Sequence, residues 1–408
     1  MPEPHGRQPP SRLAEIAAGL NRHNLTNGAT AFLFATTGPA AIYLAALAEG
    51  EFSRAETISI LSAVYGIPAV LSIAFCAAFR QPMAVGWTLP GAVLLGPALQ
   101  HLPFAEVVGA CLTCGALLAG LGASGLIGRV MRQLPAPIVM GMVAAVFVPM
   151  VVRMVSAMGE AGGLALAMLS GFIGIAVQPR LSLLFPPVLA AIAAGAAFIA
   201  VEGRVTVGGF EGGMIAAPAF FMPAFSVRAM VELVLPLTLT VIGAQNAQGF
   251  YVLRLAGFRD LQNRMTTLCG LGTFPMALLG SVPLCVTGPT NAIVSSSGPK
   301  ELRYVGGIVY AVLVLLFALF APVGVGLALA LPPAFIALLG GLAMLSVVQG
   351  AFIAAFAGKF PLGALVSFVV TLSGISIFGI GAAFWGLVFG YAASRLLERE
   401  QFHAFSAA

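Results

Sequence analysis

The polar residues that could do chemistry in this chain gather in a few short stretches inside long apolar runs. One stretch is Thr287–Asn291, in which Gly288 and Pro289 interrupt the backbone between polar side chains. Lipid offers no hydrogen bonds, so irregular backbone at membrane depth must be buried in protein or line a wet cavity. Transporters build substrate sites from helices broken in this way. The stretch therefore indicates a half-helix that ends in a site, and the alternative is a structural proline kink.

Amide and hydroxyl side chains mark two further places. Gln245 and Asn246 are costly inside hydrocarbon unless they find hydrogen-bond partners. Their alternatives are contact with a substrate or hydrogen bonds between helices. Thr36 and Thr37 precede Gly38 halfway along another apolar run. The hydroxyls of these two threonines could contact a substrate, or each could donate a hydrogen bond to a carbonyl of its own helix.

Titratable residues are missing from the middle of every apolar run. Glu56, Glu106 and Glu232 stand near the ends of runs, where we expect solvated carboxylates. The pattern supports no metal cage, no nucleophile paired with a base and no phosphate loop with its lysine. We therefore expect no enzyme activity, no metal and no cofactor.

An anion could still bind between broken helices. The free N–H groups and positive dipole end of a helix N-terminus attract negative charge without any cationic side chain. Trp87, beside a second Thr-x-Pro break, and Phe34 could form an aromatic wall, with Gln245 and Asn291 as donors. This combination suits a small carboxylate with an apolar body.

Composition places these stretches in a polytopic membrane protein. Of the 408 residues, 60% are hydrophobic and 8% are charged, whereas soluble domains are about 25% charged. The net charge of +5 is spread over short loops, which indicates no nucleic-acid partner. Cys111 and Cys114 form a CxxC inside an apolar run, where we expect small core residues.

Fourteen runs are long enough, or nearly so, to cross a bilayer. The third and the tenth are short and interrupted. The expected segments are 28–48, 55–79, 84–100, 104–123, 136–157, 161–178, 184–201, 229–250, 264–280, 283–298, 303–321, 332–357, 361–379 and 381–397.

Basic residues predict the orientation of these segments. With residues 1–27 as a cytoplasmic tail, all 19 Lys and Arg residues fall inside except Arg54, Arg153, Arg204 and Arg228. This is a strong positive-inside bias. It predicts that both termini are cytoplasmic and that the linker 202–228 is extracytoplasmic, in a protein of the cell (inner) membrane.

The two halves of the chain carry matching signals in the same order. Thr88–Pro90 and Thr287–Pro289 are both Thr-x-Pro, and Leu134-Pro135 and Leu331-Pro332 follow at nearly the same offset. Seven segments per half is an odd number, so the second copy runs inverted through the membrane. We therefore predict two inverted repeats, 28–201 and 229–397, a signature that places the site at the interrupted segments.

The chain resembles the benzoate:proton symporter family of the BenE type over nearly its whole length. The motifs that carry the resemblance are Gly86–Gly91, Gly243–Gly249 and Thr287–Ala292. That family is distantly similar to uracil permeases and sulfate permeases. The resemblance implies a seven-plus-seven fold, with segments 1–4 and 8–11 as a core domain and segments 5–7 and 12–14 as a gate. It also implies short strands within segments 3 and 10, and a possible homodimer.

The chain departs from the uracil permeases at two positions. Those proteins carry a binding carboxylate where this chain has Pro289 and another near the position of Gln245. The N–H groups of a nucleobase are bound by carboxylate acceptors. The absence of both carboxylates from this chain therefore argues against a nucleobase substrate. It fits a substrate that brings its own negative charge, and it leaves the proton-carrying group open.

We therefore predict a secondary transporter that imports benzoate or a related aromatic carboxylate by proton symport. The alternatives are transport of another small organic or inorganic anion, a passive anion channel and, least supported, a non-transporting scaffold. The expected partners are the substrate, protons and the lipid bilayer. The expected substrate-binding residues are Phe34, Thr36, Thr37, Gly38, Trp87, Thr88, Leu89, Gln245, Asn246, Thr287, Gly288, Pro289, Thr290 and Asn291.

Overall fold

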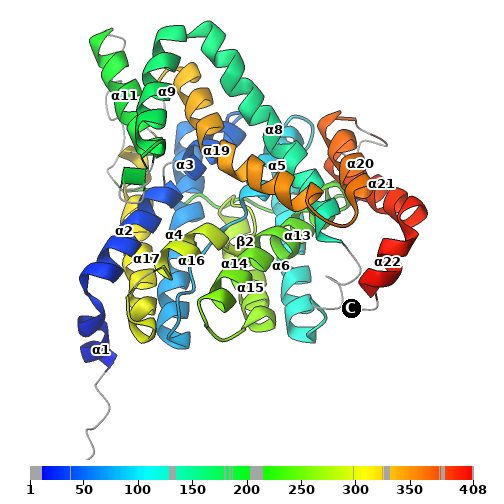
Figure 1. The fold of residues 1–408 in the computed structure, drawn as a ribbon, viewed down its shortest axis with the longest axis horizontal. Helices are drawn as coiled ribbons and strands as arrows, with labels where there is room; N and C mark the ends of the chain where they lie inside the picture. The colour runs from blue at the N-terminus through cyan, green and yellow to red at the C-terminus, as the bar shows by residue number, and fades with distance from the viewer. Residues whose placement is uncertain are drawn as a thin grey trace, which may run out of the picture.

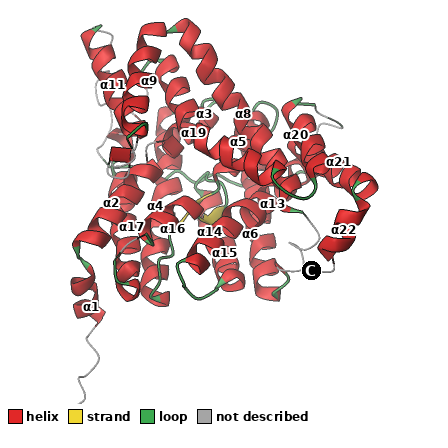
Figure 2. Ribbon diagram, viewed as in Figure 1, coloured by secondary structure: helices red, strands yellow, loops and turns green. Residues whose placement is uncertain are grey.

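The chain folds into a helical assembly around one small sheet (Figure 1 and Figure 2), as seen in a computed structural model. The structure describes residues 12–36, 38–127, 135–178, 181–182, 185, 187–202, 215–296, 298–323, 325, 331–375, 377 and 382–406. Thr37 and Arg204 lie outside these residues.

The first half contains the elements α1 (Arg12–Gly19), α2 (Arg22–Thr36), α3 (Gly38–Leu47), α4 (Arg54–Phe79), β1 (Val85–Trp87), α5 (Leu89–Leu99), α6 (Phe104–Ser124), α8 (Ala136–Glu160), α9 (Gly162–Ala176) and α11 (Pro187–Val201). The second half contains α12 (Val227–Ala229), η1 (Met230–Val234), α13 (Leu235–Leu239), η2 (Thr240–Asn246), α14 (Ala247–Leu255), α15 (Gln262–Leu278), β2 (Leu284–Val286), α16 (Gly288–Val294), η3 (Lys300–Leu302), α17 (Arg303–Leu319), α19 (Pro333–Phe356), α20 (Pro361–Leu372), α21 (Ala382–Leu397) and α22 (Arg399–Ser406).

Each of the predicted segments coincides with at least one of these helices. Within the described part of the chain, 7 helices or joined helical runs are long and apolar enough to cross a membrane. Five shorter apolar helices are α5, α9, α11, α20 and α21. The exact number of spans stays a prediction.

Local sequence explains where the key helices begin. Ser53 and Glu56 form a capping box at the start of α4, in which the Ser53 Oγ accepts from the Glu56 N–H and the Glu56 carboxylate accepts from the Ser53 N–H. At α5 the hydroxyl of Thr88 caps the helix and Pro90 occupies the first turn, where proline costs no hydrogen bond. Pro289 has the same place in α16. The two Thr-x-Pro triplets are therefore helix-start signals.

The sheet joins the two halves of the chain at the centre of the assembly (Figure 2). β1 pairs antiparallel with β2, with Gly86 opposite Cys285. Two bonds beyond the strands continue the ladder, from the Thr88 N–H to the Pro283 carbonyl at 2.9 Å and from the Thr287 N–H to the Ala84 carbonyl at 3.2 Å. Both strands are buried, which is tolerable at this depth because their backbone groups are paired.

Two sets of helices surround the sheet. The first set, around β1 and β2, comprises α2–α6 and α12–α17 and encloses the largest hydrophobic cluster. The second set comprises α8–α11 and α19–α21, with α8 packed along α19, α9 along α11 and α20 along α21. Further clusters lie within this second set and where it meets α3 and α5. Figure 1 shows the second set above and beside the first.

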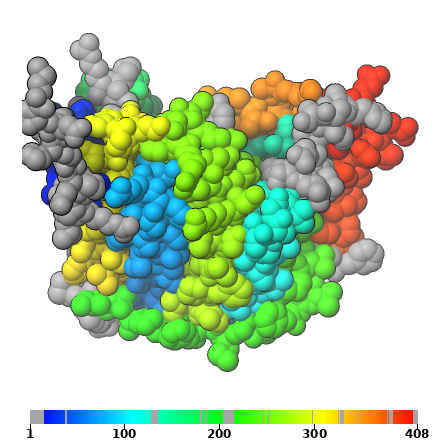
Figure 3. Space-filling view, turned by 90° about the horizontal axis from the view of Figure 1, so that it is seen from below, coloured from blue at the N-terminus to red at the C-terminus, as the bar shows by residue number. Residues whose placement is uncertain are grey.

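The part of the linker that the structure describes crosses one end of the first set. Backbone N–H groups of Ala216, Phe221 and Ala224 donate to Leu319, Leu278 and Ala105, near the ends of three helices. In Figure 3 this green segment runs along one edge of α4, α15 and α6. We call this edge the linker end. Arg259 precedes the other end of α15, where its carbonyl accepts from Gln81. The described linker residues and Arg259 therefore lie at opposite ends of the bundle.

Candidate functional site

The candidate site lies where the two strand–helix units, β1–α5 and β2–α16, meet. Thr88 and Thr287 have extended backbone and precede the first helical residues. The Thr88 Oγ1 accepts from the Gly91 N–H at 3.4 Å, so the predicted substrate-binding Thr88 is a helix cap. The other N–H groups of a first helical turn have no partner within their helix and carry partial positive charge. We call this meeting point the crossing.

Asn291 and Thr287 tie the two units together. The Asn291 Oδ1 accepts from the Ala84 N–H at 3.0 Å, and its Nδ2 donates to the carbonyls of Ala84 at 2.8 Å and Thr287 at 2.6 Å. The Thr287 hydroxyl also donates to the Ala84 carbonyl, at 3.0 Å. Asn291 is completely buried. These side chains satisfy backbone groups just outside the strands, and a part in substrate binding stays a prediction.

Asn246 holds the other side of β2. Its Oδ1 accepts from the Val286 N–H at 2.7 Å, and its Nδ2 donates to the Thr266 Oγ1 at 3.3 Å. The side chain is buried. Of the two alternatives for this amide, the structure shows the hydrogen bond between elements.

Gln245 differs from its neighbour Asn246. It is half-buried, and within the described part of the chain its amide makes no hydrogen bond. It lies in η2, a π-helical stretch, and such stretches are frequent at functional sites. Gln248 follows three residues later on the same side of the run, as i and i+3 residues do. Its side chain fills the space that a Cβ at Gly288 would need.

The aromatic side chains form a connected group beside β1. Trp87 is buried and contacts Tyr43 edge-on, with ring centroids 4.9 Å apart, and Tyr65 at 6.2 Å. Tyr65 also contacts Phe317 at 5.1 Å, and its hydroxyl donates to the Ala35 carbonyl near the end of α2. Trp87 therefore belongs to an aromatic cluster that links β1, α2, α3, α4 and α17.

The remaining predicted residues lie around this centre. Phe34 is half-buried in α2, and the Thr36 hydroxyl donates to the Phe32 carbonyl at 2.8 Å, which is the bond within its own helix. α2 ends at Thr36 and α3 begins at Gly38. Thr290 is buried beside the Tyr310 hydroxyl.

Leu89 and Pro289 occupy the first turns of α5 and α16 and are half-buried. Leu89 packs against both the central cluster and the cluster around Phe147 of α8. The start of α5 therefore lies between the two sets of helices.

The crossing carries no ionisable acid or base. The sequence has no Asp, Glu, His, Lys or Arg in 31–48, 82–100, 233–253 or 265–299, the stretches that surround it. Negative charge would meet helix N-termini and amide side chains in a poorly screened environment. The arrangement can bind an anion by hydrogen bonds but offers no general acid or base.

Sequence reasoning missed several residues that build this site. Tyr43 and Tyr65 complete the aromatic cluster, and the hydroxyls of Ser72 and Thr273 accept from the N–H groups of Val85 and Leu284, each at 3.0 Å. Only Gln248 carried a visible signal, because it shares a motif with Gln245.

Glu232 was predicted wrongly as a solvated carboxylate. It is 6% exposed and pairs with His101. Glu106 is half-buried, and its carboxylate accepts from the Ser226 hydroxyl. Burial beside a partner distant in sequence explains the error.

Solved structures share the fold of this chain. The structure of SLC26A9 matches with a TM-score of 0.62 at 15% identity, covering 93% of this chain and 65% of that one. The transmembrane domain of the cyanobacterium bicarbonate transporter BicA matches with a TM-score of 0.54 at 14% identity, covering 95% of this chain and 97% of that one. These two likenesses show that the chain has the fold of these solved structures.

Sequence comparison gives the family. The family model "Benzoate membrane transport protein" matches residues 18–396, and the chain belongs to this BenE family. The inner membrane protein YdcO of Escherichia coli is 30% identical over 317 residues, which are 76% of this chain and 80% of that protein. The benzoate membrane transport protein of Acinetobacter baylyi is 26% identical over 375 residues, 91% and 94% of the two chains. The family and the Acinetobacter baylyi relative are described as membrane transport proteins, not as enzymes.

Proposed function

We propose that this chain imports benzoate or a related aromatic carboxylate by proton symport. The carboxylate binds at the crossing, between the first turns of α5 and α16, and the ring leans on the aromatic cluster that includes Trp87. The set of helices around the sheet acts as the core, the set around α8 and α19 acts as the gate, and one moves against the other. The possible homodimer predicted above is part of this proposal.

The observation that carries the proposal is the amide of Gln245, which makes no hydrogen bond among the described residues and adjoins Asn246, the residue that bonds Val286 of β2. A half-buried amide without a protein partner is available to bond a ligand in place of water. The amide side chain of Gln248 lies against Gly288 at the start of α16, and the aromatic cluster lies beside β1. A ligand with one anionic end and one apolar end could place its anionic end against the amide donors and its apolar end against the aromatic cluster.

The proposed membrane orientation keeps both termini in the cytoplasm and the linker outside. The described linker residues and Arg259 lie at opposite ends of the bundle, as that orientation requires. We further propose fourteen spans in two inverted repeats, with β1–α5 and β2–α16 as the equivalent interrupted segments. Both units have a strand, a threonine at the N-cap and a proline in the first turn.

Uptake by purified protein in liposomes tests the proposal. Labelled benzoate should accumulate above equilibrium when the outside is acidic, and accumulation should disappear when a protonophore collapses the gradient. Equilibration without accumulation would indicate a passive channel. Failure of excess benzoate to compete with another transported anion, such as bicarbonate, would place the substrate in a different class.

A further inference from the structure

We propose that His101 and Glu232 form a protonation site that links proton binding to carboxylate binding at the crossing. The inference rests on the proposed function and deepens it by naming where the coupled proton acts. The pair lies at the linker end, which is the side from which substrate enters in the proposed orientation. Neither residue belongs to the crossing itself.

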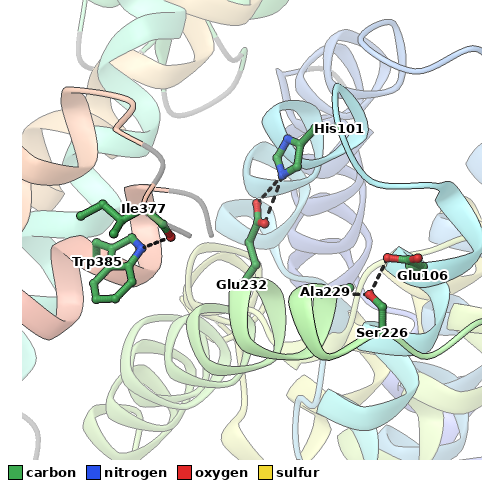
Figure 4. A network of polar contacts seen from close by, with 7 residues as sticks. All are labelled: His101, Glu106, Ser226, Ala229, Glu232, Ile377 and Trp385. Carbon is green, nitrogen blue, oxygen red and sulfur yellow. Dashed lines mark hydrogen bonds and ion pairs between the residues drawn. The ribbon is translucent and has the colours of Figure 1, made fainter. Parts of the chain in front are cut away.

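The geometry of the pair is specific. The His101 Nε2 lies 3.0 Å from one Glu232 oxygen and 3.1 Å from the other. The side chain of Glu232 is 7% exposed and that of His101 is 32% exposed. Figure 4 shows Glu232 on its helix between His101 and Trp385 of α21. The carboxylate is thus enclosed, and the imidazole keeps a route to water through which a proton can arrive.

Glu398, the other buried carboxylate among the described residues, shows why Glu232 is unusual. Two backbone N–H groups, of Leu362 and Gly363, and the Ser394 hydroxyl donate to Glu398. These fixed donors bind the Glu398 side chain at the start of α20. Glu232 has instead an imidazole as its partner. An imidazole changes charge in the range of about pH 5 to 8, so the pair can respond to the pH outside the cell.

His101 and Glu232 connect two elements that lead to the crossing, and they do so at the linker end, away from the crossing. His101 follows α5, whose first turn lies at the crossing. Glu232 lies near the start of the helical run Val227–Leu255, which contains Gln245 about 20 Å further on. Asn246 of the same run accepts a hydrogen bond from Val286 of β2, the strand that precedes α16. A bond between His101 and Glu232 therefore fixes α5 relative to the run that holds the β2–α16 unit.

The run is suited to transmit such a change. Glu232 lies in η1 and Gln245 in η2, two π-helical stretches separated by α13 with Pro236. A π-helical turn marks a place where a helix departs from regular hydrogen bonding. Small shifts at the start of the run can therefore alter the rotation of Gln245.

Other charged groups lie on the elements that pack against the pair. α6 carries Glu106, bonded to Ser226, and α12 carries the exposed Arg228. α21 carries Arg395 at its far end, over the Phe402 ring, and α13 carries no charged residue. Gln100, next to His101, donates to Glu49, which also pairs with Arg153 of α8. Glu106, Glu49 and Arg395 each keep a partner of their own, and the printed contact of the Glu232 carboxylate is with His101.

The sign of the effect follows from charge. With His101 protonated the contact is a charge-assisted bond, which is about twice as strong as a neutral one. Protonation thus favours the arrangement in which the crossing binds the carboxylate. Coupling is reciprocal, so bound carboxylate must also favour protonation. Benzoate binding by the wild-type protein should therefore take up protons and weaken about fivefold as the pH rises across the imidazole range.

Calorimetry of benzoate binding to the purified full chain tests this directly. Titrations at one pH in buffers of different ionisation enthalpy give the number of protons taken up on binding. His101→Gln and the isosteric Glu232→Gln should both reduce this number to near zero and flatten the pH dependence of affinity. His23→Gln is the matched control, because His23 is an exposed histidine far from the pair in the proposed topology. It should keep the wild-type values.

The outcomes separate the two proposals. Loss of proton uptake in both pair variants, with benzoate still bound, supports the inference. Wild-type proton uptake in either folded pair variant overturns it. If one variant fails to fold, the other decides. Absence of benzoate binding by the wild-type protein at every pH would overturn the proposed function and the inference with it.

Discussion

The two strand–helix units at the crossing have the same plan but different supports. The β1–α5 unit carries Trp87 in an aromatic cluster, and α5 has 11 residues. The β2–α16 unit has the shorter α16, of 7 residues, and is clamped by two buried amides, Asn246 and Asn291. One unit thus contributes apolar surface and a longer helix dipole, and the other contributes the polar framework. An apolar anion needs both.

The largest effect on transport is expected from a charge at the crossing. Pro289→Glu should weaken benzoate binding by roughly a hundredfold or more, because like charges a few ångström apart repel strongly in a poorly screened site. Pro289→Gln is the control, since it has nearly the same size and no charge. Labelled-benzoate binding measures both. Normal uptake by a folded Pro289→Glu protein would place the site away from the β2–α16 unit.

The largest effect on stability is expected from the amide clamp. Asn291→Ala strands the buried N–H and C=O of Ala84 and should destabilise the fold by about 2 to 4 kcal/mol. Thermal unfolding in detergent measures the loss, with Gln245→Ala as the variant that should unfold near the wild-type temperature. If the Asn291→Ala protein kept the wild-type stability but lost benzoate binding, the Asn291 amide would serve to bind the substrate and not to stabilise the fold.

Gln245→Ala should act mainly on binding. Removing a hydrogen-bonding partner of a buried ligand should weaken benzoate affinity by about 1 to 3 kcal/mol. Asn246 keeps its bonds to Val286 and Thr266, so stability should change less than in Asn291→Ala. Equilibrium binding of benzoate gives the result. Unchanged affinity in the folded variant would show that the amide serves the structure alone.

The smallest effects test whether the two units are equivalent. Ser72 and Thr273 accept from the first N–H groups of β1 and β2 at the same distance. Ser72→Ala and Thr273→Val should each cost about 1 to 2 kcal/mol, with similar losses in thermal unfolding. A large loss in one variant and none in the other would show that one strand alone maintains the crossing.

The sequence carried a local signal for the starts of α5 and α16 but none for the partners of the polar residues. Thr-x-Pro is a local signal, because proline fits the first turn of both helices and the Thr88 hydroxyl caps α5, while Thr287 has the N-cap position of α16 without a side-chain cap bond. The partners of Asn246 and Asn291 are backbone groups 40 and 207 residues away, which no local pattern encodes. Glu232 was misjudged for the same reason, since its burial depends on His101, 131 residues earlier. The π-helical stretch around Gln245 leaves no mark in the hydrophobic pattern.

The most direct test of the central claim is an experimental structure with a halogenated benzoate, in which the heavy atom reports the position of the ring. We expect the carboxylate between the first turns of α5 and α16, within hydrogen-bond distance of Gln245, and the ring against the aromatic cluster of Trp87. A ligand bound outside the crossing, or a carboxylate held by a Lys or Arg side chain, would contradict this account.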